Sequence, residues 1–235
     1  MVWNERLKIS IPKEWMVANL SDVSDIFNGA TPSTTDDNNY GNDYVWVTPK
    51  DLSDQKSKYI YQTARGITQQ GYDSCSTHLL PAKSILMSSR APIGLLAIAG
   101  CEVCTNQGFK SFVCKDPLYY QYLFYYLHNH MKQIEQMGSG TTFKEVSRDD
   151  CLRFPVLNPQ NDLIEKYSSK VEPLFQSQLQ NQKEIDRLQR LRDELLPMLL
   201  NGQVSVGKEN VYDFKPVDLQ LAAEPGSEVN CDLSH

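Results

Sequence analysis

LFQSQLQNQKEIDRLQRLRDELLPMLLNG, residues 174–202, is the stretch that decides the architecture of this chain. Its apolar residues recur mostly at spacings of three and four, which is the pattern of an amphipathic helix. A helix over residues 174–201 would be about 42 Å long at ~1.5 Å per residue. One helix cannot bury its own apolar stripe, so the stripe must fold back on the rest of the chain or meet another chain.

The helical pattern extends backwards from this stretch and contains one proline. Apolar residues continue at Ile164, Tyr167 and Val171. Pro173 has no amide hydrogen and clashes with the preceding turn, so we expect it to divide the stalk and a second helix to begin after it. Residues 159–202 are therefore predicted to be a helical spacer.

The preceding residues 1–158 show the mixed pattern of one α+β domain. Two apolar runs, 84–87 and 93–99, predict buried strands, and residues 109–114 alternate as a strand does. Residues 117–137 place apolar side chains at helical spacing. The predicted fold is thus one mixed α+β domain followed by a long helical, coiled-coil spacer.

Composition places the chain among globular proteins without a membrane span. Hydrophobic residues make up 40% of the 235 residues, and no run approaches the ~18 apolar residues of a transmembrane helix. The first residues are polar and lack the apolar core of a signal peptide. We therefore expect a cytoplasmic protein whose six cysteines are thiols.

The net charge of −6 is unevenly distributed. Residues 203–235 hold six acidic and two basic residues, lose all periodicity, and are predicted to be a disordered acidic tail. Residues 44–115 hold eight basic and four acidic residues. This locally basic segment permits a DNA-facing surface but does not require one.

Three features that suggest chemistry also have simpler interpretations. Cys101 and Cys104 have the spacing of a zinc ligand pair, but no second pair follows, so buried thiols are favoured. Residues 116–119, Asp-Pro-Leu-Tyr, resemble the loop with which adenine methyltransferases hold a flipped base, but no glycine-rich cofactor loop follows a predicted strand. The tyrosines of residues 119–126 are either core residues or a stacking platform. We expect no catalytic residue, cofactor or metal.

Basic residues in and around the predicted loops are the candidates for phosphate contacts. Each alone is more often a solvated surface charge, and only together do they suggest a DNA-binding face. They are Lys50, Lys56, Lys58, Arg65, Lys83, Arg90, Lys110 and Lys144.

An ordered series of short motifs over about residues 9–206 resembles the type I restriction–modification specificity (S) subunit. The motifs are Ile11-Pro12-x-x-Trp15; Gly29-x-Thr31-Pro32-Ser33; Trp46-Val47-Thr48; Leu80-Pro81-x-x-Ser84-Ile85-Leu86-Met87-Ser88-Ser89-Arg90-Ala91-Pro92-Ile93-Gly94; Thr105-Asn106-Gln107-Gly108-Phe109-Lys110; Gly138-Ser139-Gly140-Thr141-Thr142; and Leu188-x-x-Leu191-Arg192-Asp193-x-Leu195-Leu196-Pro197-x-Leu199-Leu200-x-Gly202. Each motif alone is weak, but their order and spacing are specific.

The resemblance implies a protein that reads DNA and carries no catalysis. Members of that family dock methyltransferase (modification) subunits and, through them, restriction subunits, and each target-recognition domain reads one half of a split site. Residues 1–158 would be such a domain and residues 159–202 its spacer. The DNA-binding residues are then expected to be Thr31, Ser33, Lys50, Lys56, Lys58, Arg65, Ser89, Arg90, Lys110 and Lys144.

A complete specificity subunit has two recognition domains and two spacers, so this chain resembles a half subunit. Two spacers paired antiparallel would hold their domains roughly 40 Å apart, close to the ~34–36 Å between successive major-groove sites on one DNA face. We therefore expect an antiparallel homodimer that reads a split palindrome. Its interface is expected to contain Leu174, Leu179, Ile185, Leu188, Leu195 and Leu199.

Two other functions stay open at this point. A stand-alone modification or cleavage enzyme would need the nucleotide-binding loop that the sequence lacks, and a methyl-transfer assay separates it. A coiled-coil adaptor that binds DNA or protein by itself is separated by DNA retention with and without a methyltransferase. If the homodimer is correct, deletion of residues 174–202 should abolish dimerisation and leave a folded domain.

Overall fold

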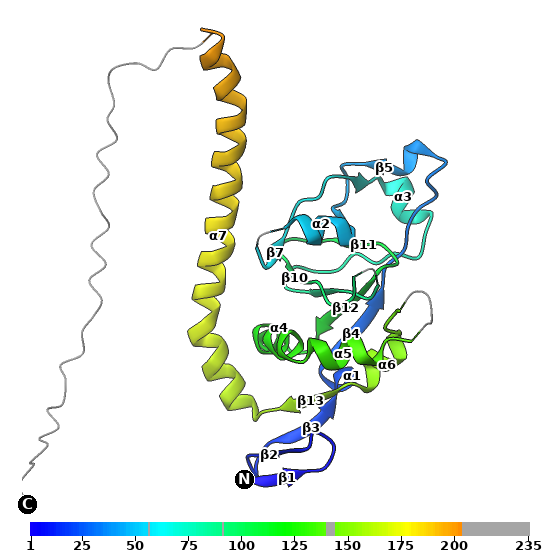
Figure 1. The fold of residues 1–235 in the computed structure, drawn as a ribbon, viewed down its shortest axis with the longest axis vertical. Helices are drawn as coiled ribbons and strands as arrows, with labels where there is room; N and C mark the ends of the chain where they lie inside the picture. Colours follow the sequence, from blue (N-terminus) through cyan, green and yellow to red (C-terminus); the bar gives the residue numbers. More distant parts are fainter. Residues whose placement is uncertain (56, 91, 140–143, 204–235) are drawn as a thin grey trace, which may run out of the picture. The chain divides into compact units, whose positions relative to one another are not determined.

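The structure of the protein is a computed structural model that describes residues 1–55, 57–90, 92–139 and 144–203 (Figure 1). A compact unit comprises Met1–Arg187, and a second unit begins at Leu188. The compact unit is a mixed α/β domain, and a long helix follows the sheet, which confirms the predicted fold class. The compact unit thus ends at Arg187, inside that helix, whereas the sequence suggested a domain end at residue 158. Most of the predicted acidic tail lies outside the described residues.

A five-stranded sheet forms the centre of the compact unit, in the order β4-β12-β9-β10-β7. Each of the first four strands is antiparallel to its neighbour, and β7 runs parallel to β10. The strands are β4 (Ser24–Asn28), β12 (Phe109–Cys114), β9 (Ile85–Ser88), β10 (Leu96–Ala99) and β7 (Tyr59–Ile60). The strand predicted over 109–114 is confirmed to the residue, and the two apolar runs form β9 and β10.

Both faces of this sheet are buried, which explains why its central strands read as continuous apolar runs. Successive side chains of a strand point to opposite faces. Ile85, Met87 and Phe112 thus belong to one core cluster, and Leu86 and Phe109 belong to another.

Five α-helices contribute to the first of these clusters. They are α1 (Leu20–Val23), α4 (Tyr120–Asn129), α5 (Met131–Met137), α6 (Arg148–Arg153) and α7 (Asn161–Leu200). The helix predicted over 117–137 is thus broken at His130, and it is preceded by a 3-10 turn, η2 (Pro117–Tyr119). Tyr119, Tyr120 and Tyr126 are buried. Of the two interpretations of the tyrosines in residues 119–126, core packing therefore holds for these three.

Four two-stranded sheets surround the central one. The pairs are β1 (Val2–Asn4) with β2 (Ile9–Ile11), β3 (Met16–Asn19) with β13 (Pro155–Asn158), β6 (Trp46–Val47) with β11 (Cys104–Thr105), and β5 (Tyr40–Gly41) with β8 (Gly66–Ile67). The short helices are α1 (Leu20–Val23), η1 (Asp37–Asn39), α2 (Pro49–Asp54) and α3 (Gln69–Asp73). Thr48 and Asp51 form a capping box that starts α2 directly after β6.

The long helix α7 runs without a break through Pro173 (Figure 1), so the prediction of a divided stalk is wrong. A proline inside a helix removes one hydrogen bond and costs about 3 kcal/mol. The part of the compact unit that precedes α7, called the sheet domain below, contacts the helix on both sides of Pro173. Ser168 and Phe175 are buried, and Glu172 accepts several hydrogen bonds from other elements. Tertiary packing therefore outweighs the local preference.

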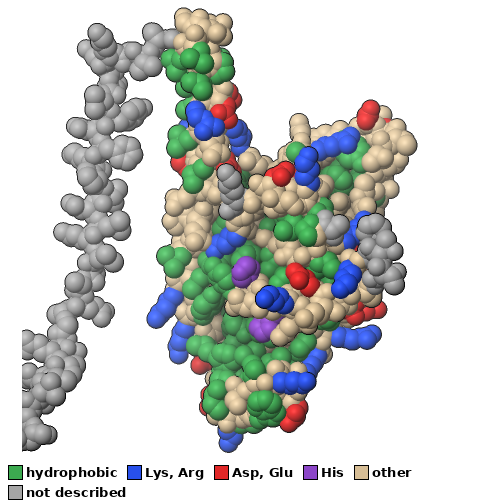
Figure 2. Space-filling view, in the orientation of Figure 1, with side chains coloured by type: hydrophobic (Ala, Val, Ile, Leu, Met, Phe, Trp, Pro, Cys, Tyr) green, Lys and Arg blue, Asp and Glu red, His purple; other side chains and the backbone are tan. Residues whose placement is uncertain are grey.

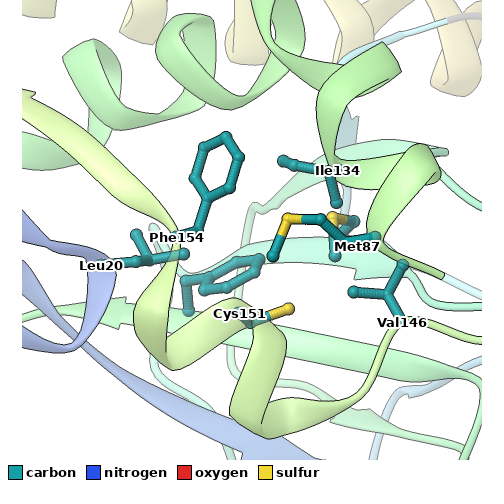
Figure 3. Close-up of a pocket in the computed structure, with 8 residues that line it drawn as sticks. Leu20, Met87, Ile134, Val146, Cys151 and Phe154 are labelled. Carbon is teal, nitrogen blue, oxygen red and sulfur yellow. The ribbon is translucent and has the colours of Figure 1, made fainter. Parts of the chain in front are cut away.

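The side chains between α5, α6 and the sheet pack tightly. Figure 3 shows Leu20, Met87, Ile134, Val146 and Phe154 pointing toward one small pocket. All of its lining residues are apolar or thiol side chains, and it has no room for a water molecule. This pocket is therefore part of the core. Among the described residues, no helix has both the length and the hydropathy that crossing a membrane requires.

Candidate nucleic-acid interface

Loops that are far apart in the sequence meet beside the small parallel sheet β6–β11. The amide of Ala30 donates to the carbonyl of Thr105 at 2.9 Å, and the indole of Trp46 donates to the carbonyl of Ala30 at 3.2 Å. The amide of Asn106 donates to the carbonyl of Val47 at 3.0 Å. These bonds join the loop after β4, the end of β6 and the turn after β11.

Two further loops join the same place. The amide of Ser89 donates to the carbonyl of Gly108 at 2.7 Å, and the amide of Val146 donates to the carbonyl of Ser89 at 3.1 Å. Ser139 and Glu145 exchange backbone hydrogen bonds of 3.1 and 3.0 Å. We call this assembly the loop cluster; it comprises residues 29–33, 47–50, 88–90, 105–110, 138–139 and 144–146.

Gly29 shows how closely the loops approach. A Cβ atom at this position would lie 2.1 Å from the carbonyl oxygen of Asn106, which no side chain tolerates. A glycine is therefore required where the first loop crosses the turn after β11.

Thr31 and Ser33 lie at the surface of the loop cluster. The hydroxyl of Thr31 donates to the side-chain oxygen of Gln107, which is exposed. Ser33 is exposed, and its hydroxyl lies 2.8 Å from that of Thr35. Both predicted residues are therefore accessible. Gln107 and its amide were missed as a candidate, although the residue stands inside one of the recognised motifs.

Two predicted cations converge on one carboxylate. Lys110 is 5% exposed, and its ammonium lies 3.2 Å from Glu145 and 3.5 Å from the hydroxyl of Ser89. Arg90 is half-exposed and lies 4.0 Å from the other oxygen of Glu145. Ser89 is fully buried. Lys110 and Ser89 are thus placed as supports of the loop cluster, whereas Arg90 remains accessible to a phosphate.

Three further lysines of the predicted set are exposed, but they differ in what they face. Lys50, in the first turn of α2, and Lys144, beside Glu145, are exposed within the loop cluster. Lys56 lies outside the described residues. Lys83 points to α7 and pairs with Glu172 at 2.7 Å.

Arg65 directly precedes β8 of the small sheet β5–β8. Its guanidinium carbon sits 3.4 Å from the ring centroid of Tyr40, and Asp37 is 3.9 Å away with a fully exposed side chain. The hydroxyl of Tyr40 donates to the carbonyl of Pro32 at 3.0 Å, which ties this sheet to the loop cluster. Stacking holds the guanidinium plane and leaves its edge for hydrogen bonds. Sequence reasoning missed Tyr40, because an isolated tyrosine in a polar loop gives no sign of its partner.

Lys58 lies outside the loop cluster and faces aromatic rings, and its role as a DNA contact stays a prediction. Its ammonium lies 3.2 Å from the ring centroid of Phe175 on α7 and has no hydrogen-bond partner among the residues that the structure describes. Burial lowers the pKa of this lysine to about 8, although the ring attracts the cation. In this position the ammonium points to Phe175 of α7 and not to the loop cluster.

Charge is dispersed over the face shown in Figure 2. Lys and Arg side chains alternate there with Asp and Glu side chains and do not merge into one basic stripe. Any DNA contact made by this face must therefore rely on a few placed cations and polar groups and less on bulk charge.

Five of the six residues predicted for dimerisation are exposed. Leu174, Ile185, Leu188, Leu195 and Leu199 have exposed fractions between 39% and 62%. The exception is Leu179, which is partly buried and packs against the core of its own domain near Gly100. Periodicity could not separate this residue from the others, because all belong to an apolar pattern on one helix.

Residues 12–188 match the family model of the type I restriction modification DNA specificity domain. The chain is 33% identical over 175 residues to the type I restriction enzyme MjaIX specificity subunit of Methanocaldococcus jannaschii, covering 74% of this chain and 40% of that protein. It is 30% identical over 197 residues to the type I restriction enzyme HindI specificity subunit of Haemophilus influenzae, covering 83% and 42%. The chain spans about two fifths of the length of these relatives.

Solved structures share the fold at lower sequence identity. The HsdS subunit from Thermoanaerobacter tengcongensis superposes with a TM-score of 0.54 at 20% identity, covering 83% of this chain and 47% of that one. The type I restriction-modification system S subunit from M. genitalium gives a TM-score of 0.50 at 16% identity, covering 81% and 47%.

Proposed function

The chain belongs to the type I restriction modification DNA specificity domain family, and from this premise we propose that it is the non-catalytic DNA-recognition component of a type I restriction–modification system. The observation that carries the proposal is the loop cluster. Motifs scattered from residue 29 to residue 146 are joined there by backbone hydrogen bonds. A scaffold that collects several loops in one place is suited to binding a ligand.

The accessible side chains divide into two roles. Lys50, Arg90 and Lys144 bind phosphates and position the domain on DNA. Arg65 and Gln107 read base edges, because a guanidinium held flat and a primary amide can each make paired hydrogen bonds to one base. Lys110 and Glu145 keep the loops in place and do not touch DNA.

Two copies of the chain pair through α7 and supply the two recognition domains of a complete specificity subunit. Support comes from helical periodicity: Leu174, Ile185, Leu188, Leu195 and Leu199 fall within ~80° of one another at ~100° per residue. The positions buried against the compact unit (Ile164, Ser168, Phe175) lie about 120° away on the helix. The leucine side is thus left for a second helix, and polar residues along it favour one register.

The paired helices act as the spacer between the two halves of the site. Leu174 and Leu199 are about 38 Å apart along a helix with a rise of ~1.5 Å per residue. Antiparallel pairing over this length matches the ~34–36 Å between major grooves on one DNA face. The two-fold axis makes the site a split palindrome. The same dimer docks methyltransferase subunits and, through them, restriction subunits, as its place in the family suggests.

Selection from a random-sequence duplex library tests this function with the full-length chain. We expect retained duplexes to carry an inverted repeat with a fixed gap, and sedimentation equilibrium to give a dimer. Retention of all duplexes alike, or of none with or without a methyltransferase of the same system, would reject the assignment and favour a coiled-coil adaptor. Methyl transfer by the chain alone would reject its non-catalytic character.

A further inference from the structure

Glu172 connects α7 to two separate parts of the sheet domain. One carboxylate oxygen accepts from the ammonium of Lys83 at 2.7 Å, and the other accepts from the hydroxyl of Tyr120 at 2.7 Å. The side-chain amide of Gln121 donates to the second oxygen, and that of Gln176 donates to the first at 2.6 Å. Four donors from the segment before β9, the start of α4 and α7 itself therefore meet at one carboxylate.

This carboxylate stays charged at neutral pH. Burial raises the pKa of Glu172, but the hydrogen bonds from Lys83, Gln176 and Tyr120 outweigh burial and hold the pKa below its usual value. Lys83 and Glu172 are both partly exposed, with side chains 44% and 28% accessible. Solvent therefore weakens the ion pair, and its importance lies in its geometry more than in its energy.

Two weaker contacts follow along the same side of α7. The hydroxyl of Tyr59 donates to the carbonyl of Phe175 at 3.0 Å. The hydroxyl of Tyr61 donates to Asp186, and the side-chain amide of Gln62 donates to the same oxygen at 3.3 Å. The three contacts extend over about 21 Å of helix.

Directional polar contacts fix a helix in a way that apolar packing does not. An apolar face tolerates small rotations and shifts, because its contacts are non-directional. A carboxylate with four donors has one satisfactory position, and polar groups at helix interfaces select one register over its neighbours. Glu172 thus fixes both the rotation and the axial position of α7 on the sheet domain.

We propose that Glu172 is a positioning residue that sets the gap between the two DNA half-sites, an inference that rests on the proposed function. From Glu172 to Leu200 the helix is about 42 Å long, so a tilt of about 10° at the anchor moves its far end by about 7 Å. This is roughly two base-pair rises of ~3.4 Å. A small change in the tilt of α7 at Glu172 therefore changes the gap length that the dimer accepts.

Duplexes that carry the selected half-sites at gaps differing by one and two base pairs provide the test. The wild type should prefer one gap by about ten-fold, and Glu172→Gln should reduce this preference to about three-fold or less. Binding to a duplex with a single half-site should stay within about two-fold of the wild type. Glu165→Gln, on an exposed position of the same helix, is the matched control and should keep the preference.

Lys83→Met removes the charge partner from the other side and should flatten the preference in the same way. If circular dichroism shows that Glu172→Gln does not fold, Lys83→Met tests the inference in its place. A purely structural role for Glu172 would lower affinity equally at every gap, and that result would overturn the inference.

The outcomes separate this inference from the function on which it rests. A wild type without gap preference contradicts the proposed function itself. A wild type with gap preference and a Glu172→Gln variant with the same preference contradict only the positioning role. Spin labels placed on α7 and on the sheet domain of the full chain give a DNA-independent readout: the variant should show a broader distance distribution, and an unchanged one counts against the role.

Discussion

The ammonium of Lys110 lies 3.2 Å from a carboxylate oxygen of Glu145, and the lysine side chain is only 7% exposed against 41% for the glutamate. Lys110 belongs to a central strand, and Glu145 belongs to a loop of the loop cluster. The pair thus joins the buried sheet to the surface proposed to read DNA. Its two side chains differ greatly in their exposure to solvent.

Removal of the glutamate charge should therefore destabilise the domain. Glu145→Gln leaves a buried ammonium without its counter-ion, and we expect a loss of roughly 1–3 kcal/mol in unfolding free energy, less than for a fully buried pair because Glu145 is half-exposed. Lys110→Met, which removes the buried charge itself, should lose less. Urea denaturation measures both; equal stability of Glu145→Gln and the wild type would show that the pair is not stabilising.

The exposed cations of the loop cluster should contribute a sequence-independent part of DNA affinity. Lys50→Gln, Arg90→Gln and Lys144→Gln should each weaken binding to all duplexes and reduce the slope of log K against log salt by about 0.9. Lys13→Gln, between β2 and β3, is the control and should leave the slope unchanged. Loss confined to one sequence would contradict the assignment as phosphate contacts.

Arg65 should behave differently, because Tyr40 holds its guanidinium plane. Arg65→Lys keeps the charge but loses the planar fork, so affinity for the selected site should fall by about 1–3 kcal/mol while affinity for random DNA changes little. Tyr40→Leu should show the same selective loss. Fluorescence anisotropy on both duplexes measures the two effects, and equal losses on both would place Arg65 among the phosphate contacts.

The exposed leucines of α7 should control the oligomeric state. If the proposed dimer forms through α7, Leu188→Asp and Leu195→Asp should convert it to a monomer without unfolding it, since these side chains are exposed in the single chain. Sedimentation velocity and circular dichroism report the two properties, with Ser177→Asp, also exposed, as the control. Dimers that persist in both variants would place the interface elsewhere.

Truncation must start later than the sequence suggested. Removal of residues 174–202 also removes Phe175, which is 3% exposed and part of the core. A chain that ends at Arg187 retains the whole compact unit, and the leucines of α7 that it lacks are all exposed.

Lys58 should make stability depend on pH in the alkaline range. Its folded pKa of about 8 lies below its usual value of 10.5, so the unfolded chain binds more protons between these values and stability rises with pH there. Lys58→Met lacks this contribution. The variant should therefore be more stable relative to the wild type at about pH 7 than at about pH 10, as measured by urea denaturation. A pH-independent difference would indicate that Lys58 is solvated.

The sequence predicted the features that depend on local pattern. The strand over 109–114 followed from its side-chain alternation, and β9 and β10 followed from their apolar runs. The start of α6 also has a local cause, because Ser147 and Asp150 form a capping box.

What the sequence determined by itself was the class of the fold, the long helix and the family, because periodicity and ordered motifs are properties of the chain alone. The tertiary structure decided which lysines face solvent, that α7 continues through Pro173, and that Leu179 packs inward while Leu174 does not. These outcomes depend on which surfaces the sheet domain presents to each side chain. Residues of one type and one spacing carry no record of those surfaces, so only their position in three dimensions separates them.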